Sequence, residues 1–201
     1  MFIQIMQGKC SKQDAMRAMT ERWTSELAPG ATGWLGGTFG FTDDGQAIAV
    51  VRFESREAAT ANSQRPEQSA WWSEVEKLYD GPVEFHDCDR VMLLMDGGSD
   101  QAGFVQVVRG KLDDPDALES GLRTMETMLH DARPEILGAT LAVEDDGTFI
   151  ETVAFTDEAA AREGEKKEIP APAAESMRQF NEMIHDVQFL DLHQPWFASK
   201  L

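Results

Sequence analysis

The stretch FIQIMQGK at residues 2–9 returns as FVQVVRGK at residues 104–111. Phenylalanine, glutamine, glycine and lysine keep their places in both copies, and two isoleucines become valines. The match continues at the same offset through the Asp-Gly pairs at residues 44–45 and 146–147. A fixed offset held over half a domain is hard to obtain by chance, so the sequence predicts an internal duplication.

The duplication suggests how the chain is divided. Its 201 residues are enough for two domains of about 100 residues each. We expect a first ferredoxin-like repeat at residues 1–96, a linker at residues 97–103 and a second repeat at residues 104–201. The linker segment is rich in glycine, serine and aspartate, which is typical of a connection between structured parts.

Each copy shows the same order of predicted elements. In the first copy they are a strand at residues 2–6, a helix, a hairpin of strands at 34–42 and 46–53, a helix at 65–79 and a strand at 83–88. The apolar face of the first helix is predicted as Met16, Trp23 and Leu27 in the first copy and as Leu118, Met125 and Leu129 in the second.

The order β-α-β-β-α-β, found twice, is that of the ferredoxin-like split βαβ unit. One such unit covers a single face of its sheet with helices and leaves the other face without cover. A second unit fused in line can supply that cover. We therefore predict an α+β fold of two tandem ferredoxin-like βαββαβ repeats whose antiparallel sheets pack face to face as an intramolecular α+β barrel.

Composition argues against several kinds of partner. Lys and Arg total 18 against 36 Asp and Glu, which gives a formal net charge of −18. Phosphate backbones and anionic membrane surfaces need a basic face, so we expect no nucleic acid and no membrane as partners. The two cysteines form no CxxC motif, the first residues lack the pattern of a signal peptide, and no apolar run is long enough to span a membrane. We expect a cytoplasmic protein.

The element order, the step FESREAA at residues 53–59 into the second helix and a tryptophan within that helix carry a family resemblance. The chain resembles the dimeric α+β barrel superfamily, whose best-known members are the antibiotic biosynthesis monooxygenase-like proteins. Members usually pair two subunits into a barrel, so the resemblance implies a monomer with an internal pseudo-dimer or a weak homodimer. Family pockets lie between the sheet and the helices of each half. Some members are cofactor-independent oxygenases acting on aromatic polyketides, and others degrade haem.

The residues that haem-degrading members use are only partly matched. Those members carry an Asn on the first strand, a Trp on the second helix and a His shortly after it. Here Gln4 holds the strand position, and Trp71 or Trp72 can hold the second. Tyr79 stands roughly where the His would be sought, and Asn62 stands where many members have a His. Haem binding is therefore a distant third hypothesis, and we predict no cofactor.

Differences between the copies indicate where one half can have specialised. The strand VEFHDC corresponds to VQFLDL in the second copy. Because strand residues alternate between faces, His86 and Cys88 share a face, and their counterparts are Leu190 and Leu192. This substitution predicts a pocket in the first half, with His86 as its acid or base and Cys88 as a ligand contact. The other interpretation is a core histidine bonded to a backbone carbonyl and water.

The run HDCD at residues 86–89 predicts no metal site. Alternation splits it between two faces, so each face offers two ligands, whereas zinc needs three or four.

Gln4 and Gln106 agree between the copies and lie inside apolar strands, where a buried amide must be hydrogen-bonded. Gln4 is therefore either a catalytic handle that orients oxygen or a substrate carbonyl, or a link to the neighbouring strand or helix. The agreement between copies favours the link.

The second helix supplies the remaining candidates. Trp71 and Trp72 cannot both face the core, because neighbours on a helix point about 100° apart. We expect one of them, Trp71 or Trp72, to wall the pocket with Tyr79 or to lie in an interface, and Asn62 to be a further ligand contact. Arg65 precedes the helix, where it can help bind an anion at the N-terminus. The alternative for this region is helix-start chemistry with large core anchors.

Two functions follow. The first is a small-molecule-binding protein of monooxygenase-like fold, such as a cofactor-independent oxygenase or a related enzyme, acting on an apolar or aromatic ligand in a first-half pocket. The second is a non-catalytic binding or interaction protein whose pockets are filled by its own side chains.

Overall fold

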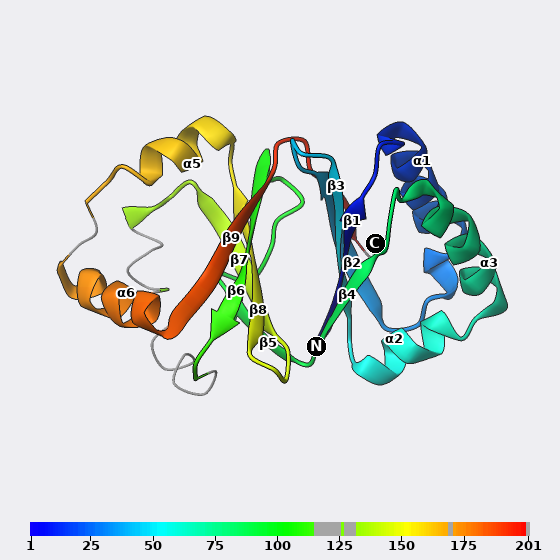
Figure 1. Ribbon diagram of the computed structural model, residues 1–201, viewed down its shortest axis with the longest axis horizontal. Helices are drawn as coiled ribbons and strands as arrows, with labels where there is room; N and C mark the ends of the chain where they lie inside the picture. The colour runs from blue at the N-terminus through cyan, green and yellow to red at the C-terminus, as the bar shows by residue number, and fades with distance from the viewer. Residues whose placement is uncertain (115–125, 127–131, 169–170, 200–201) are drawn as a thin grey trace. The chain divides into compact units, whose positions relative to one another are not determined.

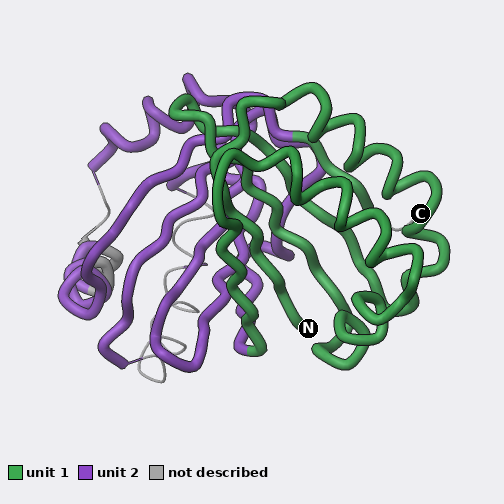
Figure 2. Tube along the Cα trace, turned by 45° about the vertical axis from the view of Figure 1, so that its right-hand side comes forward, with its two compact units in different colours: residues 1–89, 196–201 green, residues 90–195 purple. Residues whose placement is uncertain are grey.

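The computed structural model describes residues 1–114, 126, 132–168 and 171–199 (Figure 1). The predicted helical stripe Leu118, Met125 and Leu129 lies outside these residues. The described chain forms two compact units (Figure 2). Unit 1 consists of residues 1–89 and the strand β10 (Trp196–Ser199), and unit 2 of residues 90–195.

Unit 1 is a five-stranded antiparallel sheet with its helices on one face, in the strand order β10-β2-β3-β1-β4 (Figure 1). Its elements are β1 (Phe2–Lys9), α1 (Gln13–Glu26), β2 (Trp34–Phe41), β3 (Gln46–Phe53), α2 (Arg56–Ser63), α3 (Pro66–Val75) and β4 (Glu84–Cys88), with short 3-10 turns at Ala28–Gly30 and Glu76–Leu78. The predicted hairpin and the predicted helix over residues 65–79 are confirmed.

Unit 2 repeats this plan in the strand order β5-β7-β8-β6-β9. Its elements are β5 (Arg90–Leu94), β6 (Phe104–Leu112), β7 (Ile136–Val143), β8 (Thr148–Phe155), α5 (Glu158–Gly164), α6 (Ala171–Met183) and β9 (Ile184–Leu192). Two antiparallel five-stranded sheets with helices confirm the predicted α+β class and its two ferredoxin-like repeats. The face-to-face packing of the two sheets stays a prediction.

Local chemistry explains why the two copies fold alike. Gly45 and Gly147 adopt φ values of +80° and +82° in the two hairpin turns, a conformation that glycine adopts without steric cost. The side chains of Ser55 and Asp157 accept hydrogen bonds from backbone N–H groups three residues on and so start α2 and α5. The repeated Asp-Gly pair therefore sets the same turn in both units.

The two repeats exchange their last strands. β5 follows β4 in the chain but pairs with β7 of unit 2. β10 follows β9 but pairs with β2 of unit 1, where Trp196 lies opposite Phe39. The compact units thus differ from the repeats of the sequence, and the division at residues 97–103 remains a proposal about the duplication. The sequence alone does not predict either strand, because each finds its partner in the other repeat.

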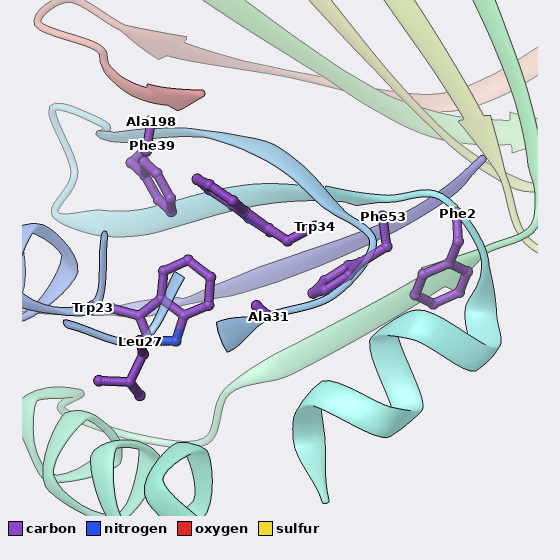
Figure 3. Close-up of a cluster of buried hydrophobic side chains, with 8 residues drawn as sticks. All are labelled: Phe2, Trp23, Leu27, Ala31, Trp34, Phe39, Phe53 and Ala198. Atoms are coloured by element: carbon purple, nitrogen blue, oxygen red, sulfur yellow. The ribbon is translucent and has the colours of Figure 1, made fainter. Parts of the chain in front are cut away.

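The helix-facing side of the unit 1 sheet carries a core rich in aromatic side chains, including Phe2, Trp23, Trp34 and Phe53 (Figure 3). These side chains are at most 7% exposed. Trp23, Trp34 and Phe53 of this core also line a cavity, so the side chains do not fill all of the space between sheet and helices.

Candidate ligand-binding site

A cavity of about 450 Å³ lies in unit 1 between the sheet and helices α1 to α3, and we call it the unit 1 cavity. Its volume falls within the range of about 300–1,000 Å³ usual for small-molecule sites. The residues that line it are Gln4, Met6, Met16, Thr20, Trp23, Trp34, Phe39, Ala49, Val51, Phe53, Asn62, Ser63, Gln68, Ser69, Trp71, Trp72, Ser73, Val75, Glu76, Tyr79 and Phe85.

Aromatic rings form a continuous series around the cavity. Trp23 contacts Trp34 edge to face with 5.2 Å between ring centroids, and lies 6.4 Å from Trp71. Trp71 lies 6.3 Å from Trp72. Trp72 in turn contacts Phe85 edge to face at 5.3 Å. Such walls present flat apolar surface and ring edges, which suit an aromatic ligand.

Two of the tryptophans are fixed by their own hydrogen bonds. The Trp23 indole N–H donates to the Gln68 side-chain oxygen at 2.6 Å. The Trp71 indole N–H donates to the backbone carbonyl of Met19 at 2.9 Å. Both rings are therefore held in place before any ligand arrives, which reduces the entropy lost on binding.

Gln4 is linked to the neighbouring strand. Its side-chain amide donates to Asp87 Oδ1 at 2.8 Å, and Gln106 does the same to Asp191 in unit 2. Agreement between the copies favoured a link to a neighbouring strand or helix, and in both units the link is to a strand. Gln4 nevertheless lines the cavity, so the link positions its amide at the edge of the site.

Tyr79 supplies a protonated hydroxyl. Burial, with a smaller contribution from the Cys10 thiol, raises the pKa of Tyr79 to about 12. The phenol therefore stays neutral near pH 7 and acts as a hydrogen-bond donor rather than a base.

Asn62, in the last turn of α2, and Arg65, directly before α3, are hydrogen-bonded to each other. Asn62 is buried and lines the cavity, and its side-chain oxygen accepts a hydrogen bond from the Arg65 guanidinium at 2.9 Å. Arg65 also bonds the Leu27 carbonyl and the Glu67 carboxylate. Its guanidinium is thus occupied by protein groups, and it orients Asn62 without lining the cavity itself.

His86 and Cys88 lie on the other face of the sheet. In the register of β1 and β4, His86 stands opposite Ile5 and Cys88 opposite Ile3, whereas Phe85 stands opposite Met6. Met6 and Phe85 line the cavity, so alternation directs His86 and Cys88 away from it. His86 is 7% exposed, and its Nε2 lies 3.8 Å from a Glu84 carboxylate oxygen. The structure therefore corrects the predicted position: these two residues do not line the unit 1 cavity.

The structure brings together five of the predicted residues, namely Gln4, Asn62, Trp71, Trp72 and Tyr79. Sequence reasoning missed Trp34 and Phe85, and assigned Trp23 to the core alone. No signal in the sequence assigned Trp34 and Phe85 to the cavity. Both lie on the helix-facing side once the strand register is known, and alternation alone does not say which face the helices cover.

The second unit differs at the centre of the corresponding surface. Ala49 stands opposite Met6 and Phe39, and its counterpart Glu151 stands opposite Val108 and Leu141. Burial raises the pKa of Glu151 to about 7. The small residue at position 49 keeps the unit 1 cavity open at a place where the second unit carries a longer side chain.

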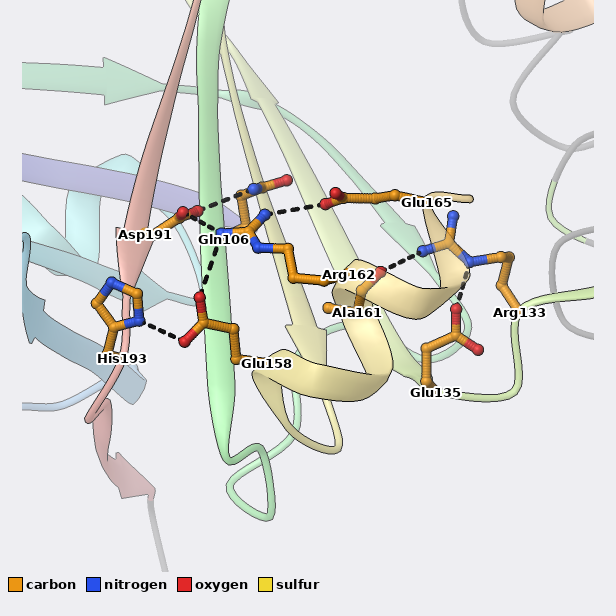
Figure 4. A network of polar contacts seen from close by, with 9 residues as sticks. All are labelled: Gln106, Arg133, Glu135, Glu158, Ala161, Arg162, Glu165, Asp191 and His193. Atoms are coloured by element: carbon orange, nitrogen blue, oxygen red, sulfur yellow. Dashed lines mark hydrogen bonds and ion pairs between the residues drawn. The ribbon is translucent and has the colours of Figure 1, made fainter. Parts of the chain in front are cut away.

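Within the part of the chain that the structure describes, the group of side chains that could hold a metal ion is a polar network in unit 2 (Figure 4). Glu158, Asp191 and His193 each place one ligand atom within 4.8 Å of the others. The Arg162 guanidinium, however, forms ion pairs with both Glu158 and Asp191. A cation already neutralises these carboxylates, so the cluster forms a salt-bridge network and we assign no metal to it.

Comparison with known proteins gives the fold. No protein-family model matches the chain. No curated protein matches it either. The structure is similar to that of a proposed monooxygenase from Lactobacillus acidophilus NCFM, with a TM-score of 0.75 and 11% identity over 100% of this chain and 97% of the other.

Two further structures agree. An anthrone oxidase-like protein gives a TM-score of 0.65 and 8% identity over 99% of this chain and 94% of the other. A ferredoxin-fold protein related to antibiotic biosynthesis monooxygenases, from Listeria monocytogenes, gives 0.51 and 9% over 96% and 94%. The chain therefore has the fold of the antibiotic biosynthesis monooxygenase-like proteins, as a tandem duplication in a single chain.

Among the described residues, no helix has the length and apolar character to cross a membrane.

Proposed function

We propose that unit 1 binds a flat, largely apolar aromatic molecule in the unit 1 cavity. The observation that carries this proposal is the series of aromatic rings around about 450 Å³ of space. Asn62, Trp71 and Trp72 contact the ligand in this proposal, and the Tyr79 hydroxyl donates to an oxygen atom on it.

The reaction that this site supports best is cofactor-independent oxygenation. A ring CH₂ group conjugated with a carbonyl through an aromatic ring loses a proton, and the resulting enolate reduces dioxygen to a carbon-bound hydroperoxide. Loss of water then leaves a new carbonyl, so one O₂ converts CH₂ to C=O plus H₂O. Similarity in fold to proposed monooxygenases supports this class of reaction.

The described lining residues divide the work. Tyr79 and Glu76 are the titratable residues among them. The neutral Tyr79 phenol stabilises the enolate oxygen by hydrogen bonding, which makes the substrate C–H more acidic. Glu76 is exposed at the edge of the cavity and can accept the proton. Gln4, held by Asp87, positions the substrate or oxygen.

We place this activity in the cytoplasm, in a monomer whose two repeats replace the two subunits of a dimer or in a weak homodimer. Neither Cys10 nor Cys88 forms a disulfide, which fits a reducing compartment.

Anthrone, a three-ring ketone with an acidic CH₂ group, is a suitable probe. Four of the five tryptophans line the cavity, so anthrone binding should quench intrinsic fluorescence. Oxygen uptake, measured separately with an electrode, reports turnover. We expect both signals with the native protein, and Tyr79→Phe should retain quenching but lose at least tenfold in oxygen uptake. Absence of quenching contradicts the binding proposal.

A second function is favoured by one observation. The Trp23, Trp71 and Gln4 donors are engaged in bonds within the protein, which leaves the cavity few groups for chemistry. Saturable quenching without oxygen uptake would identify a non-catalytic binding protein.

A further inference from the structure

Unit 1 has a second hollow beside the cavity, along the edge of its sheet. This edge hollow measures about 480 Å³. The residues that line it are Trp72, Glu76, Lys77, Gly81, Pro82, Val83 and Phe85.

The cavity and the edge hollow share three lining residues, which are Trp72, Glu76 and Phe85. The Trp72 and Phe85 rings meet edge to face, with 5.3 Å between centroids and 62° between planes. One ring comes from α3 and the other from β4. The ring pair therefore spans the space between helix and sheet at the point where the two hollows adjoin.

The two rings are held unequally. Trp72 lies against Trp71 at 6.3 Å and against Tyr79 at 6.4 Å, so it is supported on the inner side. Phe85 belongs to β4, which is an edge strand of the sheet, and 47% of its surface is exposed. A side chain with so much exposed surface changes rotamer at low cost, on a timescale of picoseconds to nanoseconds. Phe85 is the ring that can move.

Other lining residues also reach the surface, but they are of a different kind. Ser63, Ser69 and Ser73 are exposed, and their hydroxyls donate to carbonyls of their own helical segments at 2.8 to 3.3 Å. These short side chains stand on fixed helical backbone and cannot swing to open a passage. The row of serines is therefore the competing route, one that needs no moving part.

We propose that the Trp72–Phe85 pair is a gate between the edge hollow and the unit 1 cavity, and that ligands pass it when Phe85 rotates away from Trp72. The proposal rests on the proposed function, because it assigns the route by which the aromatic ligand reaches the cavity. A gate sets the rates of binding and release. Because Phe85 also lines the cavity, its removal takes away a wall contact as well as the gate. Loss of a wall contact speeds release alone, whereas loss of a gate also speeds association.

Stopped-flow quenching of tryptophan fluorescence by anthrone tests the gate. Phe85→Ala should raise the association rate constant about fivefold, because the barrier is gone, and the dissociation rate constant by at least as much, because the open route and the lost ring contact both speed release. A factor of five corresponds to about 1 kcal/mol, the order of one aromatic pair. Phe85→Leu retains an apolar side chain on the strand and should give a smaller rise in both constants.

Phe189 offers a matched control, because it is the counterpart of Phe85 on β9 of unit 2 and is 64% exposed. Phe189→Ala should leave both rate constants unchanged. Faster release without faster association in Phe85→Ala would make Phe85 a simple ligand contact and overturn the gate. Unchanged rates in both Phe85 variants would also overturn it and assign access to the serine row. Failure of the proposed function looks different, because equilibrium titration of the native protein would then show no quenching.

Discussion

Replacing Ala49 by leucine tests directly whether the unit 1 cavity is open space that a ligand uses. Ala49 is half-buried on β3 and lines the cavity. Ala47 lies two residues earlier on the same face, is 4% exposed and packs against Cys10, Met16 and Val75. Substitution by leucine therefore adds three carbon atoms to open space at Ala49 and to a packed core at Ala47.

The expected changes in stability have opposite signs. At Ala49 the added atoms bury in the cavity at ~0.8 kcal/mol each, and after the loss of rotamer freedom a net gain of about 1.5 kcal/mol remains. At Ala47 they overpack the core, which costs about 1–3 kcal/mol. For a chain of this size, ~1 kcal/mol shifts the melting temperature by about 2–4 °C. Ala49→Leu should thus melt slightly above the native protein and Ala47→Leu well below it.

Differential scanning calorimetry and anthrone titration give the two readings. Ala49→Leu should weaken anthrone binding at least tenfold, whereas Ala47→Leu should change the affinity little. The reasoning is refuted if Ala49→Leu destabilises the protein as much as Ala47→Leu does, since the space would then be filled. It is equally refuted if Ala49→Leu is stable and binds anthrone with native affinity.

Three further results are expected. Tyr79 is the single tyrosine, so ultraviolet titration should show tyrosinate only near pH 12 in the folded protein and near pH 10 in denaturant. Because the pKa of Tyr79 is higher in the folded protein, its contribution to stability is present below pH 10 and is lost between about pH 10 and 12. The raised pKa of Glu151 likewise gives a contribution to stability that is present below about pH 4 and is lost as the pH rises through about 7. Urea unfolding should therefore show that the stability of Glu151→Gln depends less on pH over that interval than the stability of the native protein. An unchanged pH profile would contradict the burial of Glu151. His86→Leu copies the residue of the second repeat, and titration should find native anthrone affinity; a tenfold loss would instead return His86 to the site.

The internal duplication made most of the fold predictable from the sequence. Residues 2–9 and 104–111 mark the same strand twice, and the turns at Gly45 and Gly147 mark the same hairpin. Each of these patterns spans only a few neighbouring residues, so each can be recognised in a single sequence. The strands β5 and β10 could not be predicted from the sequence, because a strand is stabilised by the strands beside it. The strands beside β5 and β10 belong to the other repeat. Short edge strands carry little periodic signal of their own.

The site was predictable in part for the same reason. Comparison of the copies identified a face of β4 as buried, and His86 and Cys88 are indeed buried. Burial does not say on which side of a sheet the helices lie. The side on which the helices lie depends on how the chain crosses from strand to helix. In this protein the helices lie on the side of Phe85, so Phe85 lines the cavity and His86 points away from it.

The exchange of last strands has a consequence for synthesis of the chain. Strand β2 is complete at Phe41, but its outer partner β10 begins only at Trp196. At ~5–20 residues per second, the ribosome needs roughly 10–30 s to make the intervening chain. Throughout that time the outer edge of β2 is without its partner, and unpaired edges invite association with other chains. Unit 1 is the first to be made and the last to be finished, so the protein is most vulnerable to aggregation while it is still being translated.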